Sequence, residues 1–181
     1  MTSTVVARRY AKALFAVAQE DGKFDEYSQV LNAMGELVSQ YPQVKDALVN
    51  PLYPLDVKAK VMEELIKAMA ASQIMANFFK LLVTKRRAGI IPEIVKKFQA
   101  MVDAHENISR GIVVTATEIQ DSLMGRIQET LEKITGTKVV LEKKVDPSIL
   151  GGMIAKVGDM VIDGSIKTQL MGLKDTIKRS E

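Results

Sequence analysis

The sequence contains no cysteine, no tryptophan and a single histidine, His105. Without cysteine the chain can form no disulfide, no thiolate metal site and no cysteine nucleophile, and a reducing compartment suits it. Nothing supports a Ser-His-Asp arrangement, so His105 is expected to be an exposed residue at a helix end. Paired carboxylates such as Glu63-Glu64 diverge by about 100° on a helix and do not converge on a substrate. We therefore expect no catalytic residue, no metal and no cofactor.

Long apolar runs are also missing. The longest run without a charged residue extends from Ala68 to Phe79, well short of the roughly 20 apolar residues that a membrane-spanning helix needs. Arg8, Arg9 and Lys12 interrupt the first apolar stretch, so no signal peptide is expected. No transit peptide is expected either, which favours a bacterial protein over an organellar precursor and leaves a processed organellar chain as the alternative. Any work at a membrane is expected to be peripheral.

Positive charge is in small excess over negative charge. Residues 1–105 carry 14 Lys+Arg against 11 Asp+Glu, or +3, and residues 106–181 carry 11 of each, or zero. Neither half has the basic character of a nucleic-acid-binding protein. The densest basic segment, TKRRAG (Thr84 to Gly89), is short and lacks aromatic residues for base stacking. It suits a helix C-terminus or the rim of a site for an acidic protein partner.

Apolar residues recur at helical spacing through residues 1–105 and predict six helices. Gly22 is expected to end the first helix, Pro42 to stop the second and Pro92 to lie in the first turn of the sixth. Gly89 is expected just after the fifth helix. The fourth helix is expected to start with Asp56 as its cap and to bury one stripe, formed by Val57, Val61, Leu65 and Met69.

The pattern changes after residue 105. RGIVVTA (Arg110 to Ala116) and TKVVLEKKV (Thr137 to Val145) predict strands, and a helical stripe ending at Gly136 lies between them. The predicted fold class is α+β: an antiparallel six-helix bundle over residues 1–105, followed by a small mixed α/β domain with a β-hairpin over residues 106–181.

The stretch GGMIAKVGDMVIDGS (Gly151 to Ser165) is rich in glycine but does not match a phosphate-binding loop. No Gly-Lys-Ser/Thr triplet and no Gly-x-Gly-x-x-Gly is present, and Asp159 would repel phosphate. MIAKV and MVID instead predict two strands joined by Gly158-Asp159 as a two-residue turn. Ser165 is expected to cap a final helix.

Four segments, in the same order along the chain, resemble the delta subunit of F-type ATP synthases, whose mitochondrial member is the oligomycin-sensitivity-conferring protein. They are ARRYAKALF (Ala7 to Phe15), FFKLLVTKRRAGIIPEIVKKF (Phe78 to Phe98), VDPSILGG (Val145 to Gly152) and VGDMVIDGSIKTQLMGL (Val157 to Leu173). The resemblance covers essentially the whole chain.

The resemblance implies a non-catalytic stator subunit of a proton-driven ATP synthase. The N-terminal half would bind helical segments of the alpha subunits of the catalytic head, and the C-terminal half the b subunits of the peripheral stalk. One copy per complex would keep the head from turning with the rotor, without forming a homo-oligomer. It would be peripheral on the cytoplasmic face of the bacterial inner membrane, held there only through the complex, and would bind no nucleic acid.

The resemblance also implies two sets of residues. The first- and fifth-helix positions expected to bind the alpha segment are Tyr10, Ala11, Leu14, Phe15, Ala18, Phe78, Phe79, Leu82 and Arg86. The C-terminal signature, expected for its backbone geometry, is Gly151, Gly152, Gly158, Asp159, Asp163, Gly164 and Ser165. For Ala11 and Ala18, packing inside the bundle and packing against a partner stay equally open. The alternative from another class is a free-standing helical-bundle adaptor or RNA-associated protein, although the near-neutral second half argues against RNA.

Overall fold

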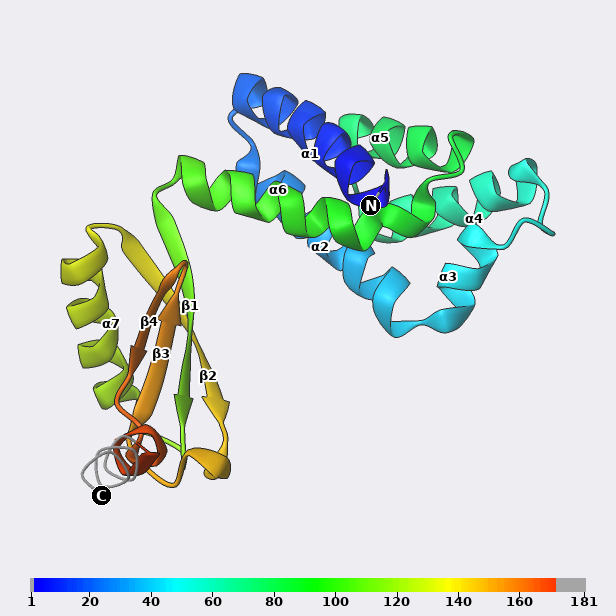
Figure 1. Cartoon of the computed structure of the whole chain (residues 1–181). Helices are drawn as coiled ribbons and strands as arrows, with labels where there is room; N and C mark the ends of the chain where they lie inside the picture. Colours follow the sequence, from blue (N-terminus) through cyan, green and yellow to red (C-terminus); the bar gives the residue numbers. More distant parts are fainter. Residues whose placement is uncertain (1, 172–181) are drawn as a thin grey trace. The chain divides into compact units, whose positions relative to one another are not determined.

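A computed structural model describes residues 2–171 of the chain, with side chains from residue 4 (Figure 1). The chain divides into two compact units, and the boundary lies between Val102 and Asp103. This boundary falls in the last turn of the sixth helix, three residues before the predicted one.

The first unit contains the six predicted helices. Their bounds are α1 Thr2–Asp21, α2 Phe24–Gln40, α3 Pro42–Val49, α4 Leu55–Ala68, α5 Gln73–Thr84 and α6 Ile91–His105. Gly22 follows α1 with a φ of +66°, the left-handed conformation that ends a helix. Pro42 and Pro92 both lie in the first turn of a helix, where their missing N–H costs no hydrogen bond.

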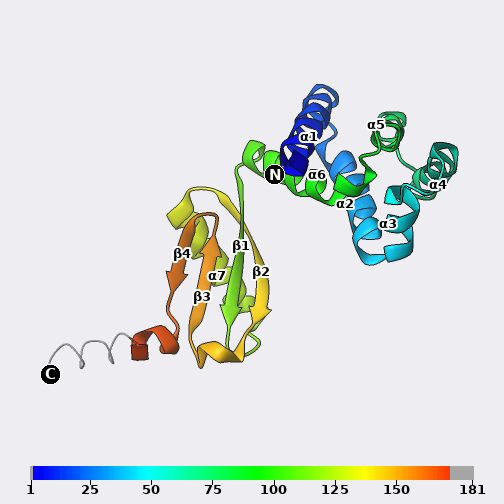
Figure 2. The same cartoon turned by 45° about the vertical axis from the view of Figure 1, so that its right-hand side comes forward.

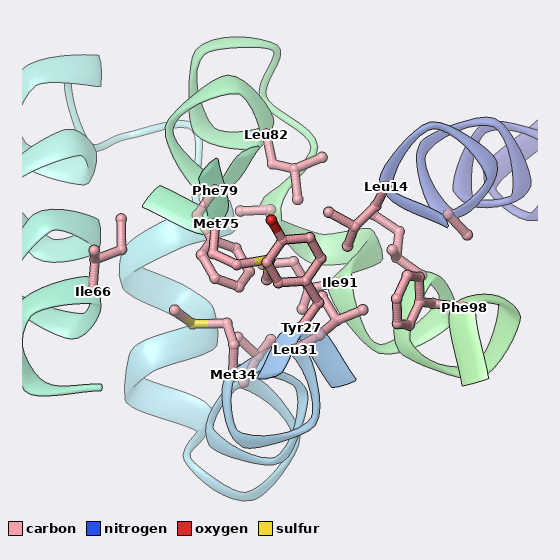
Figure 3. Close-up of a cluster of buried hydrophobic side chains, with 14 of the residues drawn as sticks. Leu14, Tyr27, Leu31, Met34, Ile66, Met75, Phe79, Leu82, Ile91 and Phe98 are labelled. Carbon is pink, nitrogen blue, oxygen red and sulfur yellow. The ribbon is translucent and has the colours of Figure 1, made fainter. Parts of the chain in front are cut away.

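All six helices contribute side chains to one buried cluster, part of which is drawn in Figure 3. Tyr27, Phe79 and Phe98 are the largest side chains that are fully buried in it. Helices α2 and α6 also approach closely, because a Cβ built on Gly35 would lie 2.6 Å from Val95 Cγ2. The labelled members in Figure 3 are Leu14, Tyr27, Leu31, Met34, Ile66, Met75, Phe79, Leu82, Ile91 and Phe98.

The predicted cap of α4 is wrong by two residues, and the predicted buried stripe is only partly right. Pro54 is the N-cap residue and Asp56 makes no capping hydrogen bond, because the helix already begins at Leu55. Val61, Leu65 and Met69 are half-buried and pack against the core as predicted, whereas Val57 is 40% exposed. The most deeply buried positions of the helix are Lys58, Met62 and Ile66. Periodicity missed this stripe because it counts lysine as polar, although four methylene groups of its side chain can pack in a core.

The predicted end of α5 is also wrong. The helix ends at Thr84, and Arg86 instead of Gly89 takes the left-handed conformation, with a φ of +55°. The backbone N–H of Arg86 donates to Val83 O (2.8 Å) and that of Arg87 to Leu82 O (2.7 Å). These two bonds form a Schellman motif, which usually has glycine at this position.

The second unit is a mixed four-stranded sheet with order β2-β1-β3-β4, seen side by side with α7 behind it in Figure 2. β1 pairs parallel with β2 and antiparallel with β3, and β3 pairs antiparallel with β4. Helix α7 is the crossover that a parallel pair requires. The bounds are β1 Ile108–Thr115, α7 Asp121–Thr135, β2 Lys138–Val145, β3 Met153–Val157 and β4 Met160–Asp163.

Alternating residues of the strands bury one face of the sheet against α7. Val113, Val139 and Ala155 meet Ile127 and Leu131 in a small core. This alternation is the usual arrangement of a sheet with one covered face. Gly136 ends α7 with a φ of +68°, as predicted.

The structure confirms the predicted hairpin and the cap that follows it. β3 and β4 flank the two-residue turn Gly158-Asp159, and Gly158 has a φ of +57°. Ser165 Oγ accepts the backbone N–H of Thr168 (3.2 Å), and residues 166–171 are helical. The last two residues of the sequence motif, Gly172 and Leu173, lie outside the described residues.

Candidate functional site: a groove beside α1

A groove of about 290 Å³ opens along α1 in the helical unit. Four of its residues come from α1 at spacings of three and four, which place them on one face of the helix. Arg87, which follows α5, closes the groove. The lining residues are Val6, Arg9, Tyr10, Ala13 and Arg87.

Tyr10 connects the two sides of this groove. Its ring meets that of Phe78 on α5 edge to face, with the centroids 6.3 Å apart. Arg87 Nη1 donates to the Tyr10 hydroxyl (3.2 Å), and the guanidinium carbon lies 5.7 Å from the ring centroid. The arginine thus combines a hydrogen bond with a cation–π contact, and its positive charge is held at the groove.

Most of the residues predicted to bind a partner lie inside the helical unit. Ala11 and Ala18, whose position had stayed open, belong to its core, and three further members of the set are as deeply buried. A side chain without exposed surface cannot contact a partner while the unit stays folded. The five with at most 2% exposure are Ala11, Leu14, Ala18, Phe79 and Leu82.

The other four predicted residues do not form a single surface. Tyr10 and Phe78 are half-buried and contact each other at the groove. Phe15 packs instead against the rings of Phe24 and Phe98, with centroids 5.3 and 6.5 Å away. Arg86 is exposed but lines a different cavity, between α3 and α4.

Sequence reasoning missed Val6, Arg9, Ala13 and Arg87 as groove residues. A signal for three of them was present, because Val6, Arg9 and Ala13 share a helical stripe with Tyr10. This stripe is less apolar than the neighbouring stripe that forms the core, so hydrophobicity alone selects the core stripe. Arg87 could not be found this way, because it lies beyond the end of α5.

The C-terminal signature residues hold a tight junction between β4 and the helix after it. Asp163 accepts the backbone N–H of Ser165 (2.9 Å) and the hydroxyl of Thr168 (2.8 Å). The pKa of Asp163 is lowered, chiefly by the bond from Ser165 N–H. Across the junction, a Cβ on Gly152 would lie 2.2 Å from the carbonyl oxygen of Gly164, so only glycine fits there.

A second, apolar groove lies in the second unit between α7 and the β3–β4 hairpin, with a volume of about 390 Å³. Leu123 and Ile134, on α7, are 45% and 57% exposed along it, and Ile162 of β4 is 36% exposed. Helical spacing groups these two α7 residues with the buried Ile127 and Leu131. One helix therefore leaves part of this sheet face uncovered.

Metal sites and membrane spans are absent from the part of the chain between residues 2 and 171. Within that range no three histidine, cysteine or carboxylate side chains come close enough together to hold a metal ion. Nor is any helix of this part of the chain long and apolar enough to cross a bilayer.

Comparison with known proteins gives consistent matches over the whole chain. The sequence model of the family described as "ATP synthase delta (OSCP) subunit" matches residues 6–177. "ATP synthase subunit delta" of Desulfotalea psychrophila is 54% identical over 181 residues, with all of both chains covered. The protein of the same name from Desulfosudis oleivorans is 38% identical over 181 residues, which cover all of this chain and 99% of the other.

A solved structure shares the fold. It is a chain of the cryo-EM structure of the Toxoplasma gondii mitochondrial ATP synthase hexamer, with a TM-score of 0.72. The match covers 94% of this chain and 96% of the other, at 21% sequence identity.

Proposed function

Because the chain belongs to the ATP synthase delta (OSCP) subunit family, a non-catalytic stator component of the F-type ATP synthase, we propose that its α1 groove binds the catalytic head. The partner would be an N-terminal helical segment of an alpha subunit. The second unit would bind the b subunits of the peripheral stalk. One copy would hold the head against rotation during ATP synthesis, peripherally on the cytoplasmic face of the bacterial inner membrane.

The head-binding part of this proposal rests on the α1 groove. Its apolar surface comes from Val6, Ala13 and the ring of Tyr10, a surface on which the apolar face of an amphipathic helix can lie. Tyr10 already contacts both Phe78 and Arg87, so little side-chain entropy would be lost on binding.

The charges at the groove favour an acidic partner segment. Arg9 and Arg87 line it, and no carboxylate is among the described residues that do so. Two positive charges beside an apolar surface favour a helix whose apolar face is flanked by Asp or Glu. Such pairs at the rim speed association more than they strengthen the complex, so the association rate should fall with salt.

The apolar groove beside α7 supports the stalk-binding part. Leu123, Ile134 and Ile162 expose apolar surface there, and such a surface is typical of a protein interface. A long helix of a stalk subunit could cover this groove with one apolar stripe.

A charge reversal at the groove tests the head-binding proposal. Arg9→Glu should weaken binding of delta-depleted catalytic heads at least tenfold, because it removes a groove cation and adds a repulsive charge. Arg8→Glu is the matched control, since Arg8 is an exposed neighbour on α1 that does not line the groove. Binding would be measured by calorimetric titration, with saturation near one chain per head.

Two results would count against this proposal. Equal weakening by both variants would show a general charge effect and no specific groove contact. Failure of the folded wild-type chain to bind heads would overturn the proposed head-binding role of the α1 groove.

A further inference from the structure

The crossing from α6 to β1 is short but firmly bonded. Only Glu106 and Asn107 separate the two elements, and the last turn of α6, from Asp103 onward, already belongs to the second unit. Two linking residues without further contacts could rotate about their φ and ψ angles. An ion pair and two hydrogen bonds instead hold this crossing, and all of them lie within the second unit.

The ion pair joins the last turn of α6 to β1. Arg110 Nε donates to Asp103 Oδ2 (2.7 Å), and Arg110 Nη2 donates to Asp103 Oδ1 (3.0 Å). Two parallel bonds between a planar guanidinium and a carboxylate fix the relative orientation of the two groups as well as their distance. The side chain of Asp103 is only 13% exposed, so water and salt screen this pair less than a fully exposed one.

The backbone of the crossing is held as well. Asn107 has a φ of +53°, a left-handed conformation that asparagine adopts more readily than most residues. Its carbonyl oxygen accepts the backbone N–H of Lys138, the first residue of β2 (3.1 Å). The hydroxyl oxygens of Ser109 and Thr137 lie 2.7 Å apart. The first residues of β1 are therefore bonded to the start of the neighbouring strand.

A second ion pair of the same unit offers a comparison. Lys143 of β2 pairs with Asp121 at the start of α7, and their side chains are 45% and 94% exposed. Such exposed pairs contribute little to rigidity or stability. The pair of Asp103 and Arg110 differs in its two-point contact and in the burial of its carboxylate.

We propose that Asp103 and Arg110 form a clamp that fixes the last turn of α6 to β1, so that α6 leaves the second unit in one defined direction. Helix α6 is continuous from Ile91 to His105. A force along it therefore reaches the sheet through the clamp as well as through the two linking residues. Asp103 and Arg110 are positioning residues in this role, and the clamp does not depend on head binding by the α1 groove.

Distances between spin labels on the full chain test the clamp. The chain contains no cysteine, so Ala104→Cys and Ser122→Cys place nitroxide labels only at the end of α6 and the start of α7, at exposed positions of the second unit. Double electron–electron resonance should give a narrow distance distribution. Asp103→Asn and Arg110→Gln should each widen it about twofold, because the two-point contact is lost. Arg110→Lys keeps the charge and should widen it less.

Two controls separate the clamp from a general loosening of the unit. Lys143→Gln removes the exposed ion pair and should leave the distribution unchanged. A second label pair, Ser122→Cys with Asp159→Cys, joins α7 to the hairpin turn and should stay narrow in the Asp103→Asn variant. An unchanged distribution in both Asp103→Asn and Arg110→Gln would overturn the clamp. Equal widening of the second label pair would also overturn it, because the whole unit would then have loosened.

The consequence for the assembled complex rests on the proposed stator role. Asp103→Asn should cause a partial loss of ATP-driven proton pumping, whereas head binding should stay at the wild-type level, because the α1 groove lies on the helical unit. Widened label distances with undiminished pumping would overturn the transfer of force through the clamp. A wild-type chain that binds no heads would reject the proposed function instead, and the label distances alone would then decide whether the clamp exists.

Discussion

Gly152 and Gly158 both have positive φ angles, +75° and +57°, but their surroundings differ. A Cβ on Gly158 would meet nothing within 4 Å, whereas a Cβ on Gly152 would lie 2.2 Å from the backbone oxygen of Gly164. Two different physical requirements therefore select glycine. At Gly158 it is backbone conformation alone, and at Gly152 it is conformation together with close approach.

Alanine at each position separates these two requirements. Gly158→Ala should lower the free energy of unfolding of the second unit by about 1 kcal/mol, the cost of a left-handed residue. Gly152→Ala should cost about 3 kcal/mol or more, because backbone atoms must move as well. Differential scanning calorimetry would measure both, since this unit contains no tyrosine or tryptophan. Equal losses would show that the contact with Gly164 carries no cost.

The individual site residues were the least predictable part of the chain. Tyr10 and Phe78 were predicted and do meet at the groove, but Leu14 and Phe79 were predicted with them and lie in the core. Neighbouring positions of one helix alternate between core and groove within a turn. Deciding between them needs the positions of the adjacent helices, which the sequence of a single helix does not contain.

Between elements, α2 and α6 pack closely at Gly35. Gly35→Ala should destabilise the unit by about 1–2 kcal/mol, because the new methyl group meets the stiff side chain of Val95. The gain in helix propensity offsets part of this cost. Urea denaturation followed by tyrosine fluorescence would measure it, with Tyr27 of α2 as one of the reporters.

Val95→Ala makes room for the new methyl group and should recover about 1 kcal/mol in the double variant. Gly125→Ala on α7 is the control, since a Cβ there meets nothing within 4 Å, and it should stabilise its own unit by about 0.5–1 kcal/mol. A stabilising Gly35→Ala would contradict a close contact between α2 and α6.

The end of a helix was predictable from sequence where a single residue at that end determines it. Gly22, Pro42 and Gly136 mark ends that follow from their own backbone chemistry. The exceptions are the buried face of α4 and the end of α5. The first depends on a buried lysine stem and the second on an arginine in a left-handed conformation, and neither residue type signals such a role.

At the scale of the whole molecule, one chain carries the head-binding and stalk-binding surfaces that we propose. Joining two binding modules in one chain makes the second binding event intramolecular. The link between α6 and β1 consists of two exposed residues, Glu106 and Asn107. Loss of that link should leave each unit folded but end its function as a stator.

A protease site inserted between His105 and Glu106 tests this role in the assembled complex. After cleavage, ATP hydrolysis should continue near its former rate while ATP-driven proton pumping falls to a small fraction. Uncut inserted complex and protease-treated wild-type complex are the controls. Undiminished pumping after complete cleavage would show that the covalent link is not required.

The place of β1 in its sheet has a mechanical consequence. β1 follows α6 after two residues and lies inside the sheet, paired with β2 over eight residues and with β3 over five. A pull transmitted along α6 would therefore enter an inner strand, whose hydrogen bonds lie across the direction of the pull. All of these bonds would be loaded in shear at once, whereas an edge strand peeled sideways would release them one after another. The sheet should therefore resist a pull along β1 more strongly than a pull that peels away an edge strand.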